Sequence, residues 1–365
     1  MEDVEEMAKR LRGIQGHHNS CYLDATLFAM FACTYTFDDI LNRPRDKHDI
    51  KEYEDIQQVL RDDIVQVLRT KKYVPHENIM QLRHCLDALG GVKGLTTEEK
   101  DPEEFLNSLF YALRVEPFLK LSSGQDTHLY QLFVEKNKDL TVPTVQQLFH
   151  QSIHDSNIKL KEIPKALIIQ MPRFGKQFKL YDYIVPSLEL DITDALEKSP
   201  RFCFVCGRLA RLQCRDCFKP GVGLESTSYC DDCSVTAHMH DDRKSHMPTK
   251  LPDVTEGAGS PFGRTRMTLF AVVCIETSHY VCFVKCPVGN QWCFFDSMAD
   301  REGGEEGQNI PNVARYREAS VWFGEAGYDK LINTNDKKIL PNMTRRLFCD
   351  AYMCMYESKF ANKYS

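Results

Sequence analysis

Three C-x-x-C pairs and two spaced histidines constrain the fold of this chain more than any other feature. They lie within about 44 residues, a segment that buries too little apolar surface to fold alone. Zinc binding contributes about 10–16 kcal/mol per site in small finger peptides, and eight ligands are enough for two closed tetrahedral sites. The sequence therefore predicts two structural zinc ions and no catalytic metal. The series is Cys203-x2-Cys206-x7-Cys214-x2-Cys217-x12-Cys230-x2-Cys233-x4-His238-x7-His246.

The spacing leaves open which ligands share an ion. Redox-active C-x-x-C pairs are the alternative to a metal site, but three such pairs followed by histidines favour zinc. Interleaved use of the pairs resembles the B-box module. Under that arrangement one zinc is bound by Cys203, Cys206, Cys230 and Cys233. The second is bound by Cys214, Cys217, His238 and His246, with His240 as an alternate for His238.

Bulk composition narrows the class of protein. The chain has 365 residues, a net charge of −6 and a pI near 6.1, whereas general nucleic-acid binders are normally basic. No apolar run approaches the roughly 18 residues that span a bilayer. The opening MEDVEEMAKR lacks the apolar core of a secretory signal, so the fifteen cysteines predict a reducing compartment, the cytoplasm.

Helical periodicity precedes strand-like patterning along the chain, which predicts an α+β fold. Apolar residues recur at three- and four-residue intervals over 50–68, 79–89 and 97–113. Short apolar segments bounded by Pro, Gly or charge then predict strands. These segments are 130–136, 166–174, 186–192, 267–276, 279–285, 291–297 and 345–358.

The Cys/His-rich composition interrupts the strand-rich half of the chain. We expect an N-terminal part over 1–196, a zinc-binding insertion over 197–255 and a C-terminal part over 262–365. A small-residue stretch over 256–263 reads as the linker after the insertion.

Cys21 lies where an apolar helix is expected to begin. Asn19 and Ser20 are both good N-cap residues, and Leu23 and Leu27 follow at helical spacing. A thiol in the first turn faces unpaired backbone N–H groups and the positive end of the helix dipole, which lowers a cysteine pKa. Cys21 is therefore the candidate nucleophile of a cysteine hydrolase.

A thiolate hydrolase also needs a histidine and a group that orients the imidazole. His279 opens one predicted strand and Asp296 ends the next, so both are expected at the same end of one sheet. An ordinary strand-end histidine and a turn aspartate would produce the same pattern, and periodicity does not choose between the twelve histidines.

Five segments resemble the ubiquitin-specific protease family. GIQGHHNSCYLDATLF resembles its cysteine box, and SHYVCFVK followed by WCFFDS resembles its histidine box. DPEEFL, LIIQMPRF and DAYMCMYES resemble three further segments in the same order. The resemblance implies a papain-like fold with a helical thumb and a β-sheet palm. It also implies hydrolysis after the C-terminal glycine of ubiquitin by Cys21, His279 and Asp296.

Two departures from the family pattern carry further expectations. The zinc fingers extension usual in the family is absent, and the B-box-like insertion comes later in the chain. That layout resembles one member of the family, which implies a preference for lysine-63-linked and linear ubiquitin chains and a role in damping NF-κB signalling. Gly16 stands where the family places an oxyanion-stabilising Asn, so the side chain of Asn19 and the N–H of Cys21 are the candidate replacements.

The resemblance also suggests how ubiquitin and other partners are held. Asp101 and Glu104 match family positions that contact the basic ubiquitin tail, although first-turn carboxylates can equally be solvated. The expected partners are ubiquitin and polyubiquitin chains, with further protein partners at the insertion and no nucleic acid. A ubiquitin-binding scaffold with an inert protease fold is the alternative function.

Overall fold

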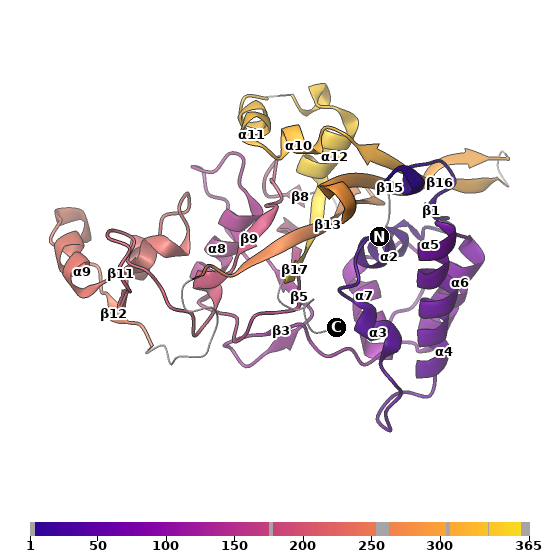
Figure 1. Cartoon of the computed structure of the whole chain (residues 1–365), viewed down its shortest axis with the longest axis horizontal. Helices are drawn as coiled ribbons and strands as arrows, with labels where there is room; N and C mark the ends of the chain where they lie inside the picture. The colour runs from indigo at the N-terminus through magenta and orange to yellow at the C-terminus, as the bar shows by residue number, and fades with distance from the viewer. Residues whose placement is uncertain (1–3, 175–177, 253–262, 304–306, 335, 359–365) are drawn as a thin grey trace. The chain divides into compact units, whose positions relative to one another are not determined.

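The computed structural model describes residues 4–174, 178–252, 263–303, 307–334 and 336–358 (Figure 1). The chain divides into two compact units. The first contains Met1–Glu116 and Phe270–Met355, and the second contains Pro117–Leu269 and Tyr356–Ser365. Each unit combines helices and strands, as the α+β prediction required.

The first unit is built around α2 (Cys21–Phe31), whose eleven residues are all buried. The sequence predicts one apolar face for this helix, but a helix that is buried all round is a core helix. Ring stacking joins it to the sheet, because Phe28 and Phe295 lie 4.1 Å apart between ring centroids. The other helices are α1 (Val4–Met7), α3 (Asp38–Asn42), α4 (Tyr53–Gln58), α5 (Gln66–Lys71), α6 (His76–Ala88), α7 (Pro102–Ala112), α10 (Ala319–Trp322), α11 (Glu325–Ile332) and α12 (Asn342–Asp350).

The sheet of the first unit is antiparallel and has the order β16-β15-β14-β13. Its strands are β13 (Arg266–Glu276), β14 (His279–Cys286), β15 (Gln291–Glu302) and β16 (Gln308–Tyr316). A short parallel pair joins β1 (Gly13–Ile14) to β2 (Tyr73–Val74). Because β1 directly precedes the loop that leads to Cys21, this pair fixes where that loop begins.

The helix predicted over 50–68 contains an irregularity. A π-helical stretch, Val59–Val65, separates α4 from α5. Its wider turn shifts the apolar stripe, so Val65 is buried where the 3.6-residue period selects Val67, which is only half-buried.

The second unit contains α8 (Val145–Ser156) and a set of short strands. Strands β5 (Leu129–Gln131) and β6 (Ala166–Gln170) are parallel, and β9 (Glu189–Asp191) pairs with the start of β13. The remaining pairs are β3 (Leu119–Lys120) with β4 (Asp126–Thr127), and β7 (Arg173–Phe174) with β8 (Phe178–Lys179). Sequence analysis missed α8, although a capping box of Thr144 and Gln147 marks its start.

The Cys/His-rich insertion belongs to the second unit. Its described residues form a three-stranded sheet of order β11-β10-β12, one α-helix, α9 (Asp231–His238), and short 3-10 turns. The strands are β10 (Leu212–Gln213), β11 (Ser228–Tyr229) and β12 (Thr249–Lys250), each of two residues. So little regular structure agrees with a segment whose fold depends on bound metal.

The closing segment of the chain corrects one sequence prediction. Residues 345–350, expected in a strand, form the end of α12, and β17 covers Ala351–Ser358. Thr344, Leu347 and Phe348 are buried at three- and four-residue spacing, which is the helical period. Most of the predicted linker over 256–263 lies outside the described residues.

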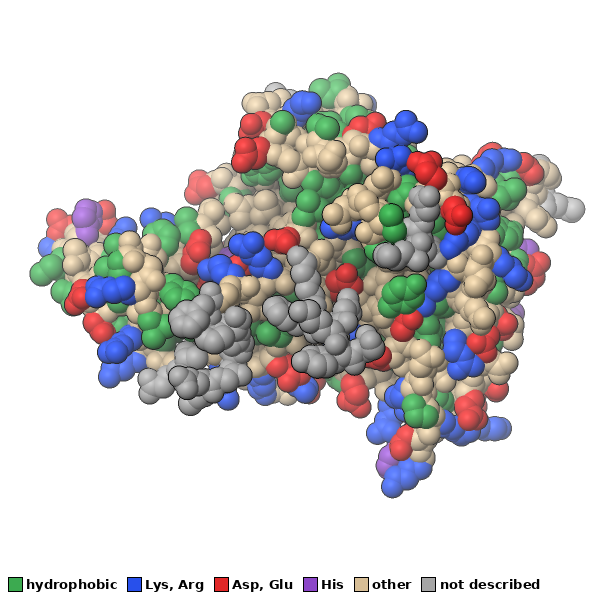
Figure 2. Space-filling view, viewed as in Figure 1, with side chains coloured by type: hydrophobic (Ala, Val, Ile, Leu, Met, Phe, Trp, Pro, Cys, Tyr) green, Lys and Arg blue, Asp and Glu red, His purple; other side chains and the backbone are tan. Residues whose placement is uncertain are grey.

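Two general features bear on partners. None of the described helices has the length and apolar character to cross a membrane. On the face in Figure 2, acidic and basic side chains are interspersed, in keeping with the net charge of −6.

Candidate functional site

Cys21 is the first residue of α2 and is 5% exposed. Ser20 occupies the N-cap position, as expected, although its side chain makes no capping hydrogen bond. The Cys21 Sγ lies 3.8 Å from the carbonyl oxygen of Ser278, the residue before β14. Among the described residues, the Cys21 N–H has no backbone acceptor, as expected at a helix start. A sulfur atom and a free N–H donor therefore lie together at the N-terminus of a buried helix.

His279 and Asp296 lie on the neighbouring strands β14 and β15 and contact each other. Nε2 of His279 is 2.8 Å from Oδ1 of Asp296, and the N–H of Met298 donates to that same oxygen at 2.9 Å. Burial lowers the pKa of His279, but hydrogen bonds to Asp296 and to Cys21 outweigh it and raise the pKa to about 10. The structure thus brings the three side chains of the predicted triad together within the first unit.

The loop before Cys21 explains why Gly16 replaces the family's Asn. The N–H of Gly16 donates to the Ser297 carbonyl at 3.0 Å. A Cβ at Gly16 would lie 2.6 Å from Cγ of Met298. No side chain fits at this position without moving the strand residue beside it. Asn19, the candidate replacement, has a left-handed φ of 57° and donates through Nδ2 to the Thr97 carbonyl at 3.1 Å.

Asp101 and Glu104 have different surroundings. Asp101 is the N-cap of α7, and its Oδ1 accepts from the Glu103 N–H at 2.8 Å. Its Oδ2 accepts from the hydroxyls of Tyr352 at 2.7 Å and Tyr280 at 3.3 Å. Glu104 is exposed in the first turn of α7. Asp101 therefore holds local structure, and Glu104 is the carboxylate open to solvent.

Two buried charged residues near the nucleophile were missed by sequence analysis. Asp24 is fully buried on α2, and Arg83 is 1% exposed on α6. Burial raises the pKa of Asp24 to about 7, although the hydrogen bond from Ser20 acts in the opposite direction. One sequence signal existed for Arg83, because it falls on the apolar face of its helix between Ile79 and Leu86.

The insertion groups its cysteines and histidines in two sets of four. The ligand atoms within each set lie within 4.8 Å of one another. Sγ of Cys206 and Sγ of Cys230 are 3.6 Å apart, close to the edge of a tetrahedron with Zn–S bonds of about 2.3 Å. The sets are Cys203, Cys206, Cys230 and Cys233, and Cys214, Cys217, His238 and His246. These sets fit two metal ions and match the interleaved arrangement.

Hydrogen bonds orient the histidines of the second set. Nδ1 of His238 lies 2.7 Å from the Ser234 carbonyl, which directs Nε2 toward Cys217 Sγ at 3.5 Å. Such a backbone acceptor fixes the tautomer of a metal-binding imidazole. His240, the alternate ligand, lies outside the set and pairs with Asp242 instead.

Known proteins resemble the chain over its whole length. The family profile described as ubiquitin carboxyl-terminal hydrolase matches residues 12–356. The ubiquitin carboxyl-terminal hydrolases CYLD of Mus musculus and Homo sapiens are each 47% identical over 377 aligned positions. Those alignments cover 100% of this chain, which spans 39% of the length of either relative. The chain therefore belongs to the ubiquitin carboxyl-terminal hydrolase family, a family of cysteine-type deubiquitinases.

Proposed function

We propose that the chain hydrolyses isopeptide and peptide bonds after the C-terminal glycine of ubiquitin, with Cys21 as nucleophile, His279 as acid–base and Asp296 as its orienting group. The observation that carries this proposal is the hydrogen bond between His279 and Asp296, together with the hydrogen bond between the same imidazole and Cys21. A raised His279 pKa favours an imidazolium beside the sulfur, which is the state that donates a proton to a leaving amine.

The mechanism follows from these positions. His279 takes the proton from Sγ of Cys21, and the thiolate forms a bond to the carbonyl carbon of the terminal glycine. The oxyanion accepts hydrogen bonds from the Cys21 N–H and from Asn19. His279 then protonates the leaving amine as the C–N bond breaks, and water cleaves the thioester. Loss of one oxyanion donor costs about 100- to 1000-fold in such reactions, so a replacement for the missing Asn is required.

Substrate recognition is assigned by charge and position. The ubiquitin tail carries arginines before its terminal glycines, so an acidic approach favours it. We propose that Glu104, exposed on α7, meets this tail and that Asp101 fixes the start of the same helix. Asp101 then contributes to binding mainly by holding Glu104 in place.

The finer assignments rest on the likeness to the CYLD proteins. We propose a preference for lysine-63-linked and linear chains, a role in damping NF-κB signalling and a cytoplasmic location. The insertion is proposed to be a B-box-like module whose two zinc ions are structural and which offers a surface to protein partners.

A panel of differently linked diubiquitins tests the proposal, with native protein compared to Cys21→Ala. Cleavage by native protein, with preference for the two linkages named, is the expected result. A ubiquitin probe with a C-terminal electrophile distinguishes an active hydrolase from an inert scaffold, because an inert scaffold would leave Cys21 unmodified. Absence of both cleavage and labelling would contradict the proposed activity.

A further inference from the structure

The nucleophile follows a tight turn with an uncommon backbone. His17 to Ser20 form this turn, and the N–H of Ser20 donates to the His17 carbonyl at 3.2 Å. Both central residues have left-handed φ values, 45° at His18 and 57° at Asn19. Non-glycine residues are strained in this region, so surrounding groups must hold the turn. We call these four residues the nucleophile turn.

Arg83 holds the carbonyl side of the nucleophile turn. Its Nη1 donates to the His17 carbonyl and its Nη2 to the His18 carbonyl, each at 2.8 Å. Its Nε donates to the carbonyl of Leu95, which also accepts from the hydroxyl of Tyr22. One buried guanidinium therefore ties two consecutive peptide groups of the turn to a separate loop. A planar, five-donor group suits this task better than an ammonium.

Ser20 and Asp24 hold the amide side. The His17 N–H donates to Oγ of Ser20 at 2.8 Å, and that hydroxyl donates to Oδ2 of Asp24 at 2.6 Å. Ser20 and Asp24 are both fully buried. Oδ1 of Asp24 has no hydrogen-bond partner among the described residues, so the Ser20 hydroxyl is the group that Asp24 holds. The contacts therefore lead from the turn through Ser20 to the buried side of α2.

We propose that Arg83 and the Ser20–Asp24 pair are positioning residues, which clamp the carbonyl and N–H groups of the nucleophile turn and aim its backbone at the oxyanion. The inference rests on the proposed function and deepens it. Gly16 leaves no space for the family's Asn side chain, so stabilisation of the oxyanion depends on donors carried by the turn and by Cys21. A donor aids catalysis only when it is already aimed at the developing charge. The clamp supplies that preorganisation.

Three measurements on each variant separate this role from a merely structural one. Hydrolysis of a ubiquitin C-terminal coumarin amide reports kcat and KM. Inhibition by ubiquitin aldehyde reports oxyanion stabilisation, because its tetrahedral adduct carries the same oxygen. Alkylation of Cys21 by iodoacetamide needs no oxyanion and reports only the reactivity of the sulfur. Thermal denaturation checks that each variant is folded.

Ser20→Ala and Arg83→Lys each remove part of the clamp. We expect kcat to fall about 10- to 100-fold and aldehyde affinity to fall by a similar factor, with KM and the alkylation rate within about threefold of native. Asp24→Asn keeps an acceptor for the Ser20 hydroxyl and should hydrolyse within about threefold of native. Asp24→Ala lacks the acceptor and should behave like Ser20→Ala.

Thr26→Val is the matched control. Thr26 is fully buried on α2, and its hydroxyl donates to the Tyr22 carbonyl without reaching the nucleophile turn. This variant should retain native kcat and aldehyde affinity.

Two results would overturn the clamp while leaving the proposed function intact. One is native hydrolysis by Ser20→Ala and Arg83→Lys, and the other is an equal loss of hydrolysis and alkylation. A native protein that neither hydrolyses the coumarin substrate nor binds the aldehyde would instead overturn the proposed function, and the clamp with it.

Discussion

Nε2 of His279 lies 2.8 Å from Oδ1 of Asp296, and the same oxygen accepts the N–H of Met298. The backbone of β15 thus fixes the carboxylate, and the carboxylate fixes the imidazole. His279 keeps its proton to unusually high pH because its pKa is raised to about 10, with burial opposed by the bonds to Asp296 and Cys21. Catalysis that needs an imidazolium should therefore persist well above neutral pH.

Asp296→Asn should lower the His279 pKa, because the charge that stabilises the imidazolium is lost. We expect kcat/KM to fall about 100- to 10,000-fold and its alkaline limb to move from near pH 10 to lower pH. A pH profile of ubiquitin–coumarin hydrolysis measures both effects. Asp300→Asn, an exposed change on the same strand, is the control and should leave the profile unchanged. An unshifted alkaline limb in Asp296→Asn would contradict the assignment.

The candidate site divides into residues that sequence could identify and residues that it could not. Cys21 and His279 could be predicted because they begin a helix and a strand, and strands adjacent in sequence pair in this sheet. Asp296 was predicted at the end of its strand, but it lies within β15, which continues to Glu302 beyond a register shift. The zinc ligands could be predicted because their spacing lies within one short segment of the sequence. The role of Asp24 could not be predicted, because its protonation and its contacts depend on burial by strands that are distant in the sequence.

Sequence analysis missed two helices. Helix α8 has buried apolar residues at helical spacing, Val145, Leu148, Phe149 and Ile153, as well as a capping box. Both signals were present, but the segment lies between strand-like segments and was read with them. Helix α12 ends at Asp350 and strand β17 begins at the next residue. Residues 345–350 are a short run, and the strand sequence after them has few β-branched residues, so the sequence gives no clear boundary between helix and strand. Helix α2 is buried on every side, and its sequence contains the signal for this, because only Asp24 and Thr26 interrupt its apolar residues.

Asp24 should make stability depend on pH. Its folded pKa, about 7, is above its usual value of 3.8, so the fold binds the proton more tightly than the unfolded chain. The sign follows from that difference: this contribution to stability is present below pH 3.8 and is lost as pH rises through about 7. Asp24→Asn should therefore be more stable than native at pH 8 by about 1–4 kcal/mol and gain little at pH 4. Urea denaturation at both pH values measures this, and an equal gain at the two would contradict it.

Gly16→Asn should not restore the family's oxyanion donor. Its Cβ would lie 2.6 Å from Cγ of Met298, so we expect a loss of about 1–3 kcal/mol in stability from overpacking. Met298→Ala should relieve part of that loss when combined with it, and a double-mutant cycle in urea measures the coupling. Additive losses in the cycle would show that Met298 is not the obstacle.

Metal analysis tests the insertion. We expect two zinc ions per chain, one of which is lost in His246→Ala because that imidazole lies with Cys214 and Cys217. His240→Ala is the matched control and should keep both ions, since His240 lies outside the set. Zinc content by mass spectrometry and thermal denaturation with and without a chelator are the measurements. Loss of an ion from His240→Ala would reassign the ligands.

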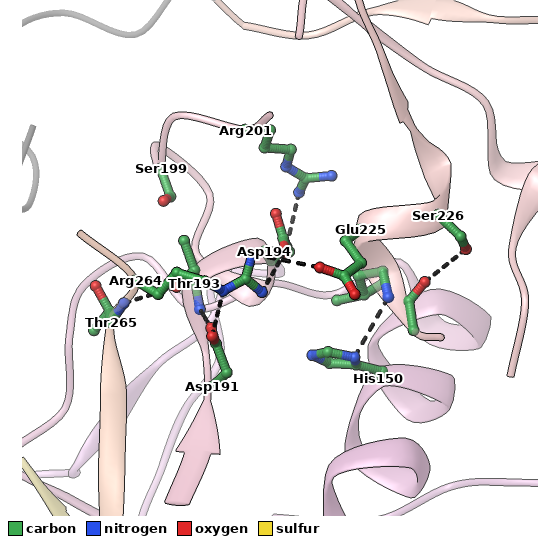
Figure 3. Close-up of polar contacts among 12 residues, drawn as sticks. His150, Asp191, Thr193, Asp194, Ser199, Arg201, Glu225, Ser226, Arg264 and Thr265 are labelled. Carbon is green, nitrogen blue, oxygen red and sulfur yellow. Dashed lines mark hydrogen bonds and ion pairs between the residues drawn. The ribbon is translucent and has the colours of Figure 1, made fainter. Parts of the chain in front are cut away.

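Arg264 should stabilise the attachment of the insertion within the second unit. Its guanidinium contacts Asp191, Asp194 and Glu225, and Asp194 is 3% exposed (Figure 3). Arg201, at the other end of the insertion, donates to the Asp194 carbonyl at 2.8 Å, so both ends of the insertion meet at one residue.

Removing one partner of a buried ion pair costs about 3–5 kcal/mol, and the one-third exposure of Arg264 reduces this to about 2–3 kcal/mol. Arg264→Met should therefore speed hydrogen exchange in β9 and around Asp194, whereas Arg266→Met, which changes a more exposed neighbour, should not. Equal exchange in the two variants would show that the ion pairs at Asp194 do not hold the insertion.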